Sequence, residues 1–291
     1  MDSTALALVM SAAQIHAGWN LAAKRVPGGS ALFVWCYYTV GAVVFVPVLA
    51  TLLLTRSYEP RPAWLVAILG NAVLHIAYGV VLQRGYTIGD LSVVYPLARG
   101  TGPLLSGAFA VLVQHERPGP LALLGGLLIV VGVLVIGFGR PASAAGEDPS
   151  RRRLGIAFGV LTGAVIAGYT LWDAHSVTAL AVPPVIYFGA ATLLQSTLML
   201  PMALRFRPRV ARIWHDHKVE AIIIGIASPV AYLLVLFALQ RAPVSLVAPA
   251  REVSIVFGAL IGWLVLSEPN PARRLAGAVV VLAGIAAIAV G

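Results

Sequence analysis

The sequence predicts an all-α integral membrane protein in which ten transmembrane helices form two inverted repeats of five. Three observations lead to this prediction: the composition, the number of long apolar stretches, and a constant offset between the two halves of the chain. Of 291 residues, 59% are hydrophobic and 11% are charged, and the mean hydropathy is +0.91. Soluble domains carry about 25% charged residues. A chain this apolar belongs in a lipid bilayer.

Ten apolar stretches have the length of about 20 residues that a membrane-spanning helix needs. Proline, glycine and clusters of charge separate them. The expected helices are Thr4–Ala23, Ala31–Leu54, Trp64–Gln83, Leu91–Val113, Leu121–Phe138, Leu154–Trp172, Pro183–Leu204, Val219–Leu239, Val244–Leu266 and Arg274–Val290. The longest polar break, residues 140–153, is expected to be a flexible linker between a first repeat at 1–139 and a second at 154–291. The basic break at 205–218 is expected to lie along the lipid headgroups.

The two halves repeat each other at an offset of 152 positions. The matching pairs are Arg99 and Arg251, Glu116 and Glu268, Gly125 and Gly277, and Gly132 and Gly284. Chance does not produce one constant offset across charged and glycine positions. Five helices per repeat is an odd number, so the second repeat enters the membrane from the opposite side, as in secondary transporters that bind substrate near the bilayer midplane.

Several motifs carry a resemblance to a known family. In the first expected helix the motif is Trp19-Asn20, followed by Lys24. In the second half it is the segment from residues 245–249 through 257–260 to Leu266-Ser267-Glu268, and then the last helix with Gly277 and Gly284. The first half repeats these features at residues 91–103, 115–116, 125 and 132. Over nearly the whole chain the sequence resembles the EamA family of the drug/metabolite transporter superfamily. The resemblance implies a ten-helix carrier that exports or exchanges small metabolites by alternating access, without ATP hydrolysis. Arg99 and Arg251 stand where many relatives carry apolar or small polar residues, so no particular substrate is implied.

Composition also narrows the partners. The net charge is +9, but the basic residues lie in short breaks between apolar runs, which is typical of bilayer anchors rather than of a nucleic-acid surface. Cys36 is the only cysteine, so neither an intramolecular disulfide nor a zinc site is expected. We expect no cofactor and no metal. The expected partners are the bilayer and a small-molecule substrate, with protons as a candidate coupling ion, and both a monomer and a homodimer remain open.

The charge distribution leaves the membrane orientation open. With the N-terminus inside, the inner breaks hold Arg56, Arg61, Arg117 and Arg241, and fourteen basic residues lie outside. The positive-inside rule therefore favours both termini outside, whereas the family resemblance implies both inside. The even number of helices places the two termini on one side in either case. The expected location is the bacterial inner (plasma) membrane.

The most informative residues are two arginines inside apolar helices. Arg99 and Arg251 lie about eight and seven residues into their helices, about 12 Å and 10 Å deep at 1.5 Å per residue. A charge there is costly and indicates a functional site. The planar guanidinium suits carboxylate or phosphate oxygens. The alternative is structural: one arginine pairs with Glu252, and the other binds carbonyls freed by a proline.

Glu252 is interpreted as the only carboxylate well inside a helix. It is either a proton-coupling group or a static counter-ion to one of the arginines. Together with Arg99 and Arg251 it leaves a charge of +1, which favours a substrate with a negative group, such as an amino acid or another zwitterion.

Aromatic residues are expected to line the same site. His16, Trp19 and Asn20 share one helix face at i, i+3 and i+4, and Tyr169, Trp172 and Asp173 share the matching face in the second repeat. We predict that these faces bind substrate, together with Tyr78 and Tyr95. The alternatives are an interfacial belt for the tryptophans and a headgroup position for Asp173.

The third helix adds His75, which the sequence predicts as a second proton-coupling candidate, with Tyr232 as its counterpart in the other repeat. The alternative is a neutral histidine bonded to a facing helix.

Prolines and glycines interrupt the helices that carry the arginines. Pro96, Gly100 and Pro103 in the fourth helix and Pro249 in the ninth are gating candidates. Glu116 and Glu268 are expected to cap the helices that follow them.

The sequence therefore predicts a secondary transporter of a small polar organic metabolite, by proton antiport or by exchange. A carrier of organic cations or drugs is the main alternative. An enzyme is not expected, because no HExxH motif and no catalytic aspartate pair occur. A channel would show rings of like residues, and a membrane scaffold is a weaker alternative.

Overall fold

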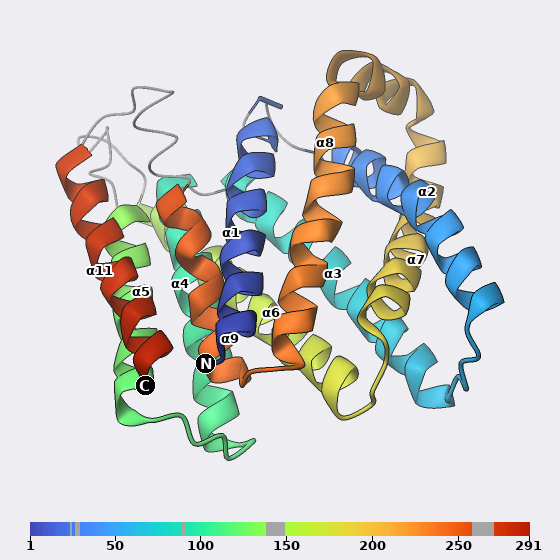
Figure 1. The fold of residues 1–291 in the computed structure, drawn as a ribbon. Helices are drawn as coiled ribbons and strands as arrows, with labels where there is room; N and C mark the ends of the chain where they lie inside the picture. The colour runs from blue at the N-terminus through green and yellow to red at the C-terminus, as the bar shows by residue number, and fades with distance from the viewer. Residues whose placement is uncertain (24, 27–29, 89–90, 138–148, 258–270) are drawn as a thin grey trace.

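The computed structural model describes residues 1–23, 25–26, 30–88, 91–137, 149–257 and 271–291, and these residues form helices and short connections (Figure 1). The elements are α1 (Ser3–Ala23), α2 (Ala31–Thr55), α3 (Pro62–Ile88), α4 (Leu91–Leu112), α5 (Pro120–Gly137), α6 (Pro149–Thr178), α7 (Pro184–Arg205), α8 (Arg207–Leu239), α9 (Val244–Ala250), the 3₁₀-helix η1 (Arg251–Val253) and α11 (Pro271–Val290). Lys24, Glu268 and positions 140–148 of the expected linker lie outside the described residues.

Each of the ten predicted stretches contains a helix, but four of these helices have a boundary that differs by five residues or more. Helix α3 ends at Ile88, five residues beyond the predicted end at Gln83. Helix α6 begins at Pro149 and continues to Thr178, six residues beyond the predicted end at Trp172. The break at 205–218 is largely helical, because its Arg, Ala and Lys residues favour helix, and it joins α8 at a kink where His217 has φ −133°. Helix α9 ends at Ala250, directly after Pro249, and the chain tightens into η1.

Five helices of the described chain are long and apolar enough to cross a membrane: Ala31–Thr55, Pro62–Ile88, Arg153–Thr178, Pro184–Arg205 and Arg207–Leu239. Shorter apolar helices span Pro120–Ile136 and Leu275–Val290. Large apolar side chains also cover the exterior, with Leu65 72% and Leu112 74% exposed. Exposure on this scale suits lipid, since acyl chains solvate leucine and water does not.

The helix contacts come in pairs that the two repeats explain. In the repeat, α6 is the counterpart of α1, α8 is the counterpart of α3, and α9 with η1 is the counterpart of α4. The contact of α1 with α8 therefore matches that of α6 with α3, and the contact of α4 with α6 matches that of η1 with α1. Two further contacts join counterparts directly: α2 with α7, and α5 with α11. Figure 1 shows α5 and α11 at one end of the molecule and α2 and α7 at the other, with the remaining helices between them.

The repeated glycines form the crossing of α5 and α11. A Cβ on Gly125 would lie 2.5 Å from the Gly284 carbonyl oxygen, and a Cβ on Gly132 would lie 2.8 Å from that of Gly277. In the repeat, Gly277 is the counterpart of Gly125, and Gly284 is the counterpart of Gly132. Gly125 nevertheless meets Gly284, and Gly132 meets Gly277. The two helices therefore run antiparallel. Only glycine permits this approach of two backbones, which is why the offset of 152 is kept at these positions.

The two chain ends lie together. The Met1 amino group donates a hydrogen bond of 3.4 Å to the Ile288 carbonyl oxygen near the end of α11 (Figure 1). The prediction that both termini lie on one side is therefore confirmed.

Candidate functional site

Three charged side chains meet at the centre of the helix bundle. Arg99 comes from α4, and Arg251 and Glu252 come from η1, the 3₁₀ turn that follows Pro249. Their residues are 6%, 8% and 1% exposed. The predicted symmetry of the two arginines therefore brings them to one site.

Glu252 lies between the two arginines. Its Oε2 is 3.1 Å from Arg99 Nε, and its Oε1 is 3.5 Å from Arg251 Nε. One carboxylate thus serves two guanidinium groups, and the cluster keeps a charge of +1. The predicted counter-ion role of Glu252 is consistent with this geometry, and both arginines share it.

Arg99 is held from several sides. Its Nη2 lies 3.0 Å from His16 Nε2 on α1 and donates a hydrogen bond of 3.2 Å to Ser254 Oγ. The guanidinium carbon lies 5.9 Å from the centre of the Tyr95 ring. An arginine has no acceptor atom, so His16 must accept through Nε2 and its proton must be on Nδ1. His16 is therefore a neutral imidazole in this arrangement.

Arg251 is held less completely. Its guanidinium lies 5.8 Å from the centre of the Tyr169 ring. Its 3.5 Å contact with Glu252, like the 3.1 Å contact of Arg99 Nε, is an ion pair without a hydrogen bond. Its Nη2 is buried and has no hydrogen-bond partner among the described residues. The indole Nε1 of Trp19 is likewise buried and unpartnered. Each such donor costs about 1–3 kcal/mol, so both are available to a ligand.

A second buried carboxylate, Asp173, lies on α6. Its helix face was predicted to bind substrate, with a headgroup position as the alternative, and Glu252 was expected to be the only carboxylate well inside a helix. Instead Asp173 is 0% exposed. Its Oδ1 accepts from Asn71 Nδ2 at 2.8 Å and Tyr187 Oη at 2.6 Å. The interpretation of Glu252 as the only such carboxylate was wrong, because α6 continues past Trp172 and α3, α7 and α8 enclose the Asp173 side chain.

The other oxygen of Asp173 completes the network. Its Oδ2 lies 3.0 Å from His75 Nε2 and accepts from Tyr232 Oη at 2.5 Å. His75 and Tyr232, the predicted counterparts, thus meet on one carboxylate oxygen. Asn71 in turn accepts from Gln195 Nε2 at 3.3 Å. The signal that would have found this network is the presence of Asn71 and Gln195 inside apolar runs, where an unpaired amide is costly.

Aromatic rings join the two clusters. Tyr169 lies on His75, with ring centroids 4.3 Å apart, and it contacts Tyr78 at 5.6 Å and Tyr232 at 6.3 Å. The same Tyr169 ring lies beside the Arg251 guanidinium. Tyr169 is therefore the only described residue that has a ring contact with His75 and a cation-π contact with an arginine of the cluster.

Three of the predicted site residues make contacts outside this cluster or within their own helix. Trp172 packs on Gly70 of α3, and its Nε1 donates to the Ala67 carbonyl oxygen at 2.9 Å. Asn20 donates to the carbonyl oxygen of His16 in its own helix at 2.8 Å. Trp19 contacts the His16 ring edge-on at 4.6 Å.

The gating candidates flank the arginines. Pro96 and Pro103 lie within a continuous α4, three and four residues from Arg99. A Cβ on Gly100 would lie 2.8 Å from Leu134 of α5, so this glycine is where α4 packs on α5. Pro249 lies in the last turn of α9, two residues before Arg251.

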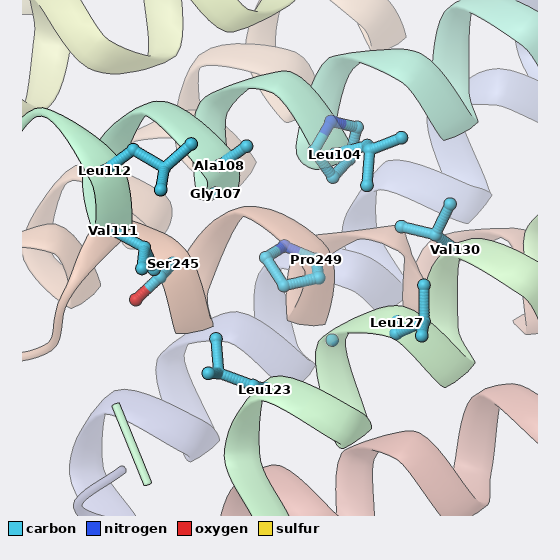
Figure 2. Close-up of a pocket in the computed structure, with 12 residues that line it drawn as sticks. Leu104, Gly107, Ala108, Val111, Leu112, Leu123, Leu127, Val130, Ser245 and Pro249 are labelled. Atoms are coloured by element: carbon cyan, nitrogen blue, oxygen red, sulfur yellow. The ribbon is translucent and has the colours of Figure 1, made fainter. Parts of the chain in front are cut away.

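An apolar groove of about 250 Å³ lies beside these helices but does not include the charged cluster (Figure 2). It is lined by parts of α4, α5 and α9, with Pro103, Leu127 and Pro249 among its residues. Ser245 is the only hydroxyl-bearing residue in that lining. Several of its leucines are exposed on the exterior. The groove therefore faces lipid and does not suit a charged substrate.

Glu116 was expected to cap the helix that follows it, and this prediction was wrong. Its two carboxylate oxygens accept from the backbone N–H groups of Val244 and Ser245, both at 2.9 Å, at the start of α9. His115, at φ 57°, turns the chain at this point. A residue of the first repeat thus caps the broken helix of the second.

Comparison with known proteins places this geometry in a family. A model of the EamA-like transporter family matches residues 3–138 and again residues 153–290. The chain belongs to the EamA-like transporter family. The predicted resemblance is confirmed, and a membrane transporter of ten helices in two repeats is the architecture that the family and the structure share.

Individual relatives of this EamA-like transporter add less. A protein named as a multidrug transporter, from Pseudomonas aeruginosa, is 38% identical over 76 residues, which is 26% of this chain and 66% of that protein. The match thus spans slightly less than two thirds of the relative. A crystal structure with 19% sequence identity superposes with a TM-score of 0.76, covering 99% of this chain and 96% of the other. At that identity the likeness shows the fold alone.

Proposed function

We propose that this EamA-like transporter carries a small organic metabolite with a negative group, such as an amino acid, by alternating access. The observation that carries the proposal is the unpartnered Nη2 of Arg251 in a buried cluster of charge +1. Arginine presents a planar set of donors that matches carboxylate oxygens. The indole N–H of Trp19, whose ring contacts His16 beside Arg99, is a second donor without a partner.

A zwitterion fits better than a simple anion. Glu252 Oε1 is buried and has no hydrogen bond among the described residues, although it lies 3.5 Å from Arg251 Nε. An α-amino acid carries an ammonium beside its carboxylate, so it would meet an unfilled acceptor and an unfilled donor that are neighbours in the protein. Pairing both removes the cost of leaving them buried and unsatisfied.

Alternating access is supported by burial. Arg99, Arg251 and Glu252 are each less than a tenth exposed. A substrate reaches them only if the helices part. The elements suited to that movement are α4, which contains prolines and carries Arg99, and α9, which contains Pro249 and leads directly into η1 with Arg251 and Glu252.

A carrier of organic cations is the second candidate, and Asp173 is the observation that favours it. A buried carboxylate surrounded by Tyr169, Tyr187 and Tyr232 resembles a site for an ammonium group. However, its two oxygens already accept from or contact four protein groups. A cation would have to displace some of them, so Arg251 is the stronger site.

Thermal-shift measurements on the purified protein test the choice. The panel contains amino acids, aminophosphonates, phosphate esters and organic cations, and a ligand at 100 times its Kd stabilises by about 2.7 kcal/mol. We expect stabilisation by acidic or zwitterionic compounds that is lost in Arg251→Gln and kept in Arg241→Gln, a matched change at an exposed arginine. Stabilisation by cations alone, lost in Asp173→Asn, would refute the proposal in favour of the second candidate.

A further inference from the structure

Asp173 carries a charge for which no permanent cation lies in contact among the described residues. The groups that face it are Asn71 and His75 from α3, Tyr187 from α7 and Tyr232 from α8. Of these only His75 can become positive. An unpaired carboxylate inside a membrane is costly, so the charge state of this network depends on whether His75 holds a second proton.

The hydrogen bonds allow that proton to bind without rearrangement. With Asp173 ionised, His75 donates through Nε2–H to Oδ2 at 3.0 Å. The second ring nitrogen, Nδ1, is then free to take a proton, and the pair changes from −1 to 0 while all four bonds to the carboxylate remain. The His75 side chain is 11% exposed and that of Asp173 is 0%. Of the two side chains, the imidazole is therefore the more accessible to a proton.

Glu252, the other proton-coupling candidate, lies in the opposite electrostatic setting. Two guanidinium groups flank it at 3.1 and 3.5 Å. Both guanidinium groups remain positively charged, so each of them needs this carboxylate as a counter-ion. Glu252 is thus suited to a fixed counter-ion, and the exchangeable proton belongs elsewhere.

Tyr169 connects the His75 pair to the Arg251 site. Its ring lies 4.3 Å from the His75 ring and 5.8 Å from the Arg251 guanidinium carbon. A protonated His75 and Arg251 would then be two cations that share one ring, and they would repel each other. An anion bound to Arg251 removes that repulsion. By linkage, anion binding and protonation of His75 must each favour the other.

From this geometry we infer that His75 and Asp173 form a one-proton site, coupled through Tyr169 to anion binding at Arg251. The use of this proton in transport rests on the proposed function, whereas the existence of the proton site does not. The coupling has a definite sign: a proton and an anionic substrate are bound together, as in symport, whereas a cationic substrate would compete with the proton.

Ring-nitrogen NMR of the ¹⁵N-histidine-labelled full chain in detergent micelles tests the site without any substrate. The chain has six histidines, and His75→Gln assigns the signal of interest by its loss. Between about pH 8 and 5, where histidines change charge, we expect His75 to gain its second ring proton in the wild type. In Asp173→Asn the carboxylate is gone, and His75 should stay singly protonated over the same range.

Two controls make the result decisive. Glu59→Gln, a change at an exposed carboxylate outside both clusters, should leave the His75 signal unchanged, and replacing sodium chloride with potassium chloride should have no effect. A wild-type His75 that remains singly protonated throughout would overturn the inference, even if Asp173→Asn does not fold. Equal protonation in Asp173→Asn, a loss of protonation in Glu59→Gln, or dependence on sodium would do so too. Because no substrate is present, these outcomes are independent of the thermal-shift screen.

Discussion

The contact of Glu116 with the start of α9 offers a sharp test of how the two repeats are joined. Glu116→Ala removes two hydrogen bonds of 2.9 Å that the Val244 and Ser245 N–H groups donate. A hydrogen bond to a charged group contributes about 1.5–3 kcal/mol, and loss of a helix cap costs about 0.5–2 kcal/mol. Glu116 is only partly buried, so water can replace part of the loss. We expect a destabilisation of about 2 kcal/mol.

Unfolding in mixed micelles, followed by circular dichroism against denaturing detergent, measures this change. Glu59→Ala, at an exposed carboxylate in the connection between α2 and α3, is the matched control and should change stability by less than about 0.5 kcal/mol. Glu116→Gln keeps one acceptor and should fall between the two. If Glu116→Ala were as stable as Glu59→Ala, the cap across the repeats would contribute nothing, and the reasoning from its geometry would be wrong.

Three further changes test the packing and the cluster, each measured by the same unfolding assay. Gly132→Ala should destabilise the protein by about 2 kcal/mol or more, because the new Cβ would lie 2.6 Å from Val281 Cγ2. Gly79→Ala is the control and should not destabilise it, because no atom lies within 4 Å of that Cβ. Equal stability of the two variants would contradict the close crossing of α5 and α11. Ala181→Gly should stabilise the protein by about 0.5 kcal/mol, because Ala181 has φ 52°, a conformation that costs a residue with a Cβ about 1–2 kcal/mol. A loss of stability in this variant would contradict the strain at Ala181. Glu252→Gln should destabilise by about 3 kcal/mol, because it leaves two buried guanidinium groups without a counter-ion, and an unchanged stability would show that the arginines do not depend on it.

Much of the architecture was predictable because the bilayer imposes simple rules on a sequence. Helices must be about 20 apolar residues long, so the ten stretches could be located without knowing their neighbours. The glycine pairs at one offset also predicted the repeat, and the structure explains them as one antiparallel crossing of α5 and α11. The burial of Arg99 and Arg251 in one cluster follows from the same symmetry.

The errors concern contacts between distant parts of the chain. Helical periodicity shows which residues share a face, but not which other helix meets that face. Trp172 was expected in the site with Trp19, yet it faces Ala67 and Gly70 of α3. Glu116 was expected to act on the next helix, and its partners are more than 120 residues away.

The sequence by itself determined the class of protein: the membrane helices, the two repeats, the EamA family and the buried positive charge. Only the tertiary structure decided how that charge is shared. It bonded Arg99 Nη2 to His16 and Ser254, left Arg251 Nη2 without a hydrogen-bond partner among the described residues, and enclosed Asp173 with His75. The physical reason is that hydrophobicity and spacing act locally along the chain, whereas satisfying a buried polar atom depends on side chains that come from other helices.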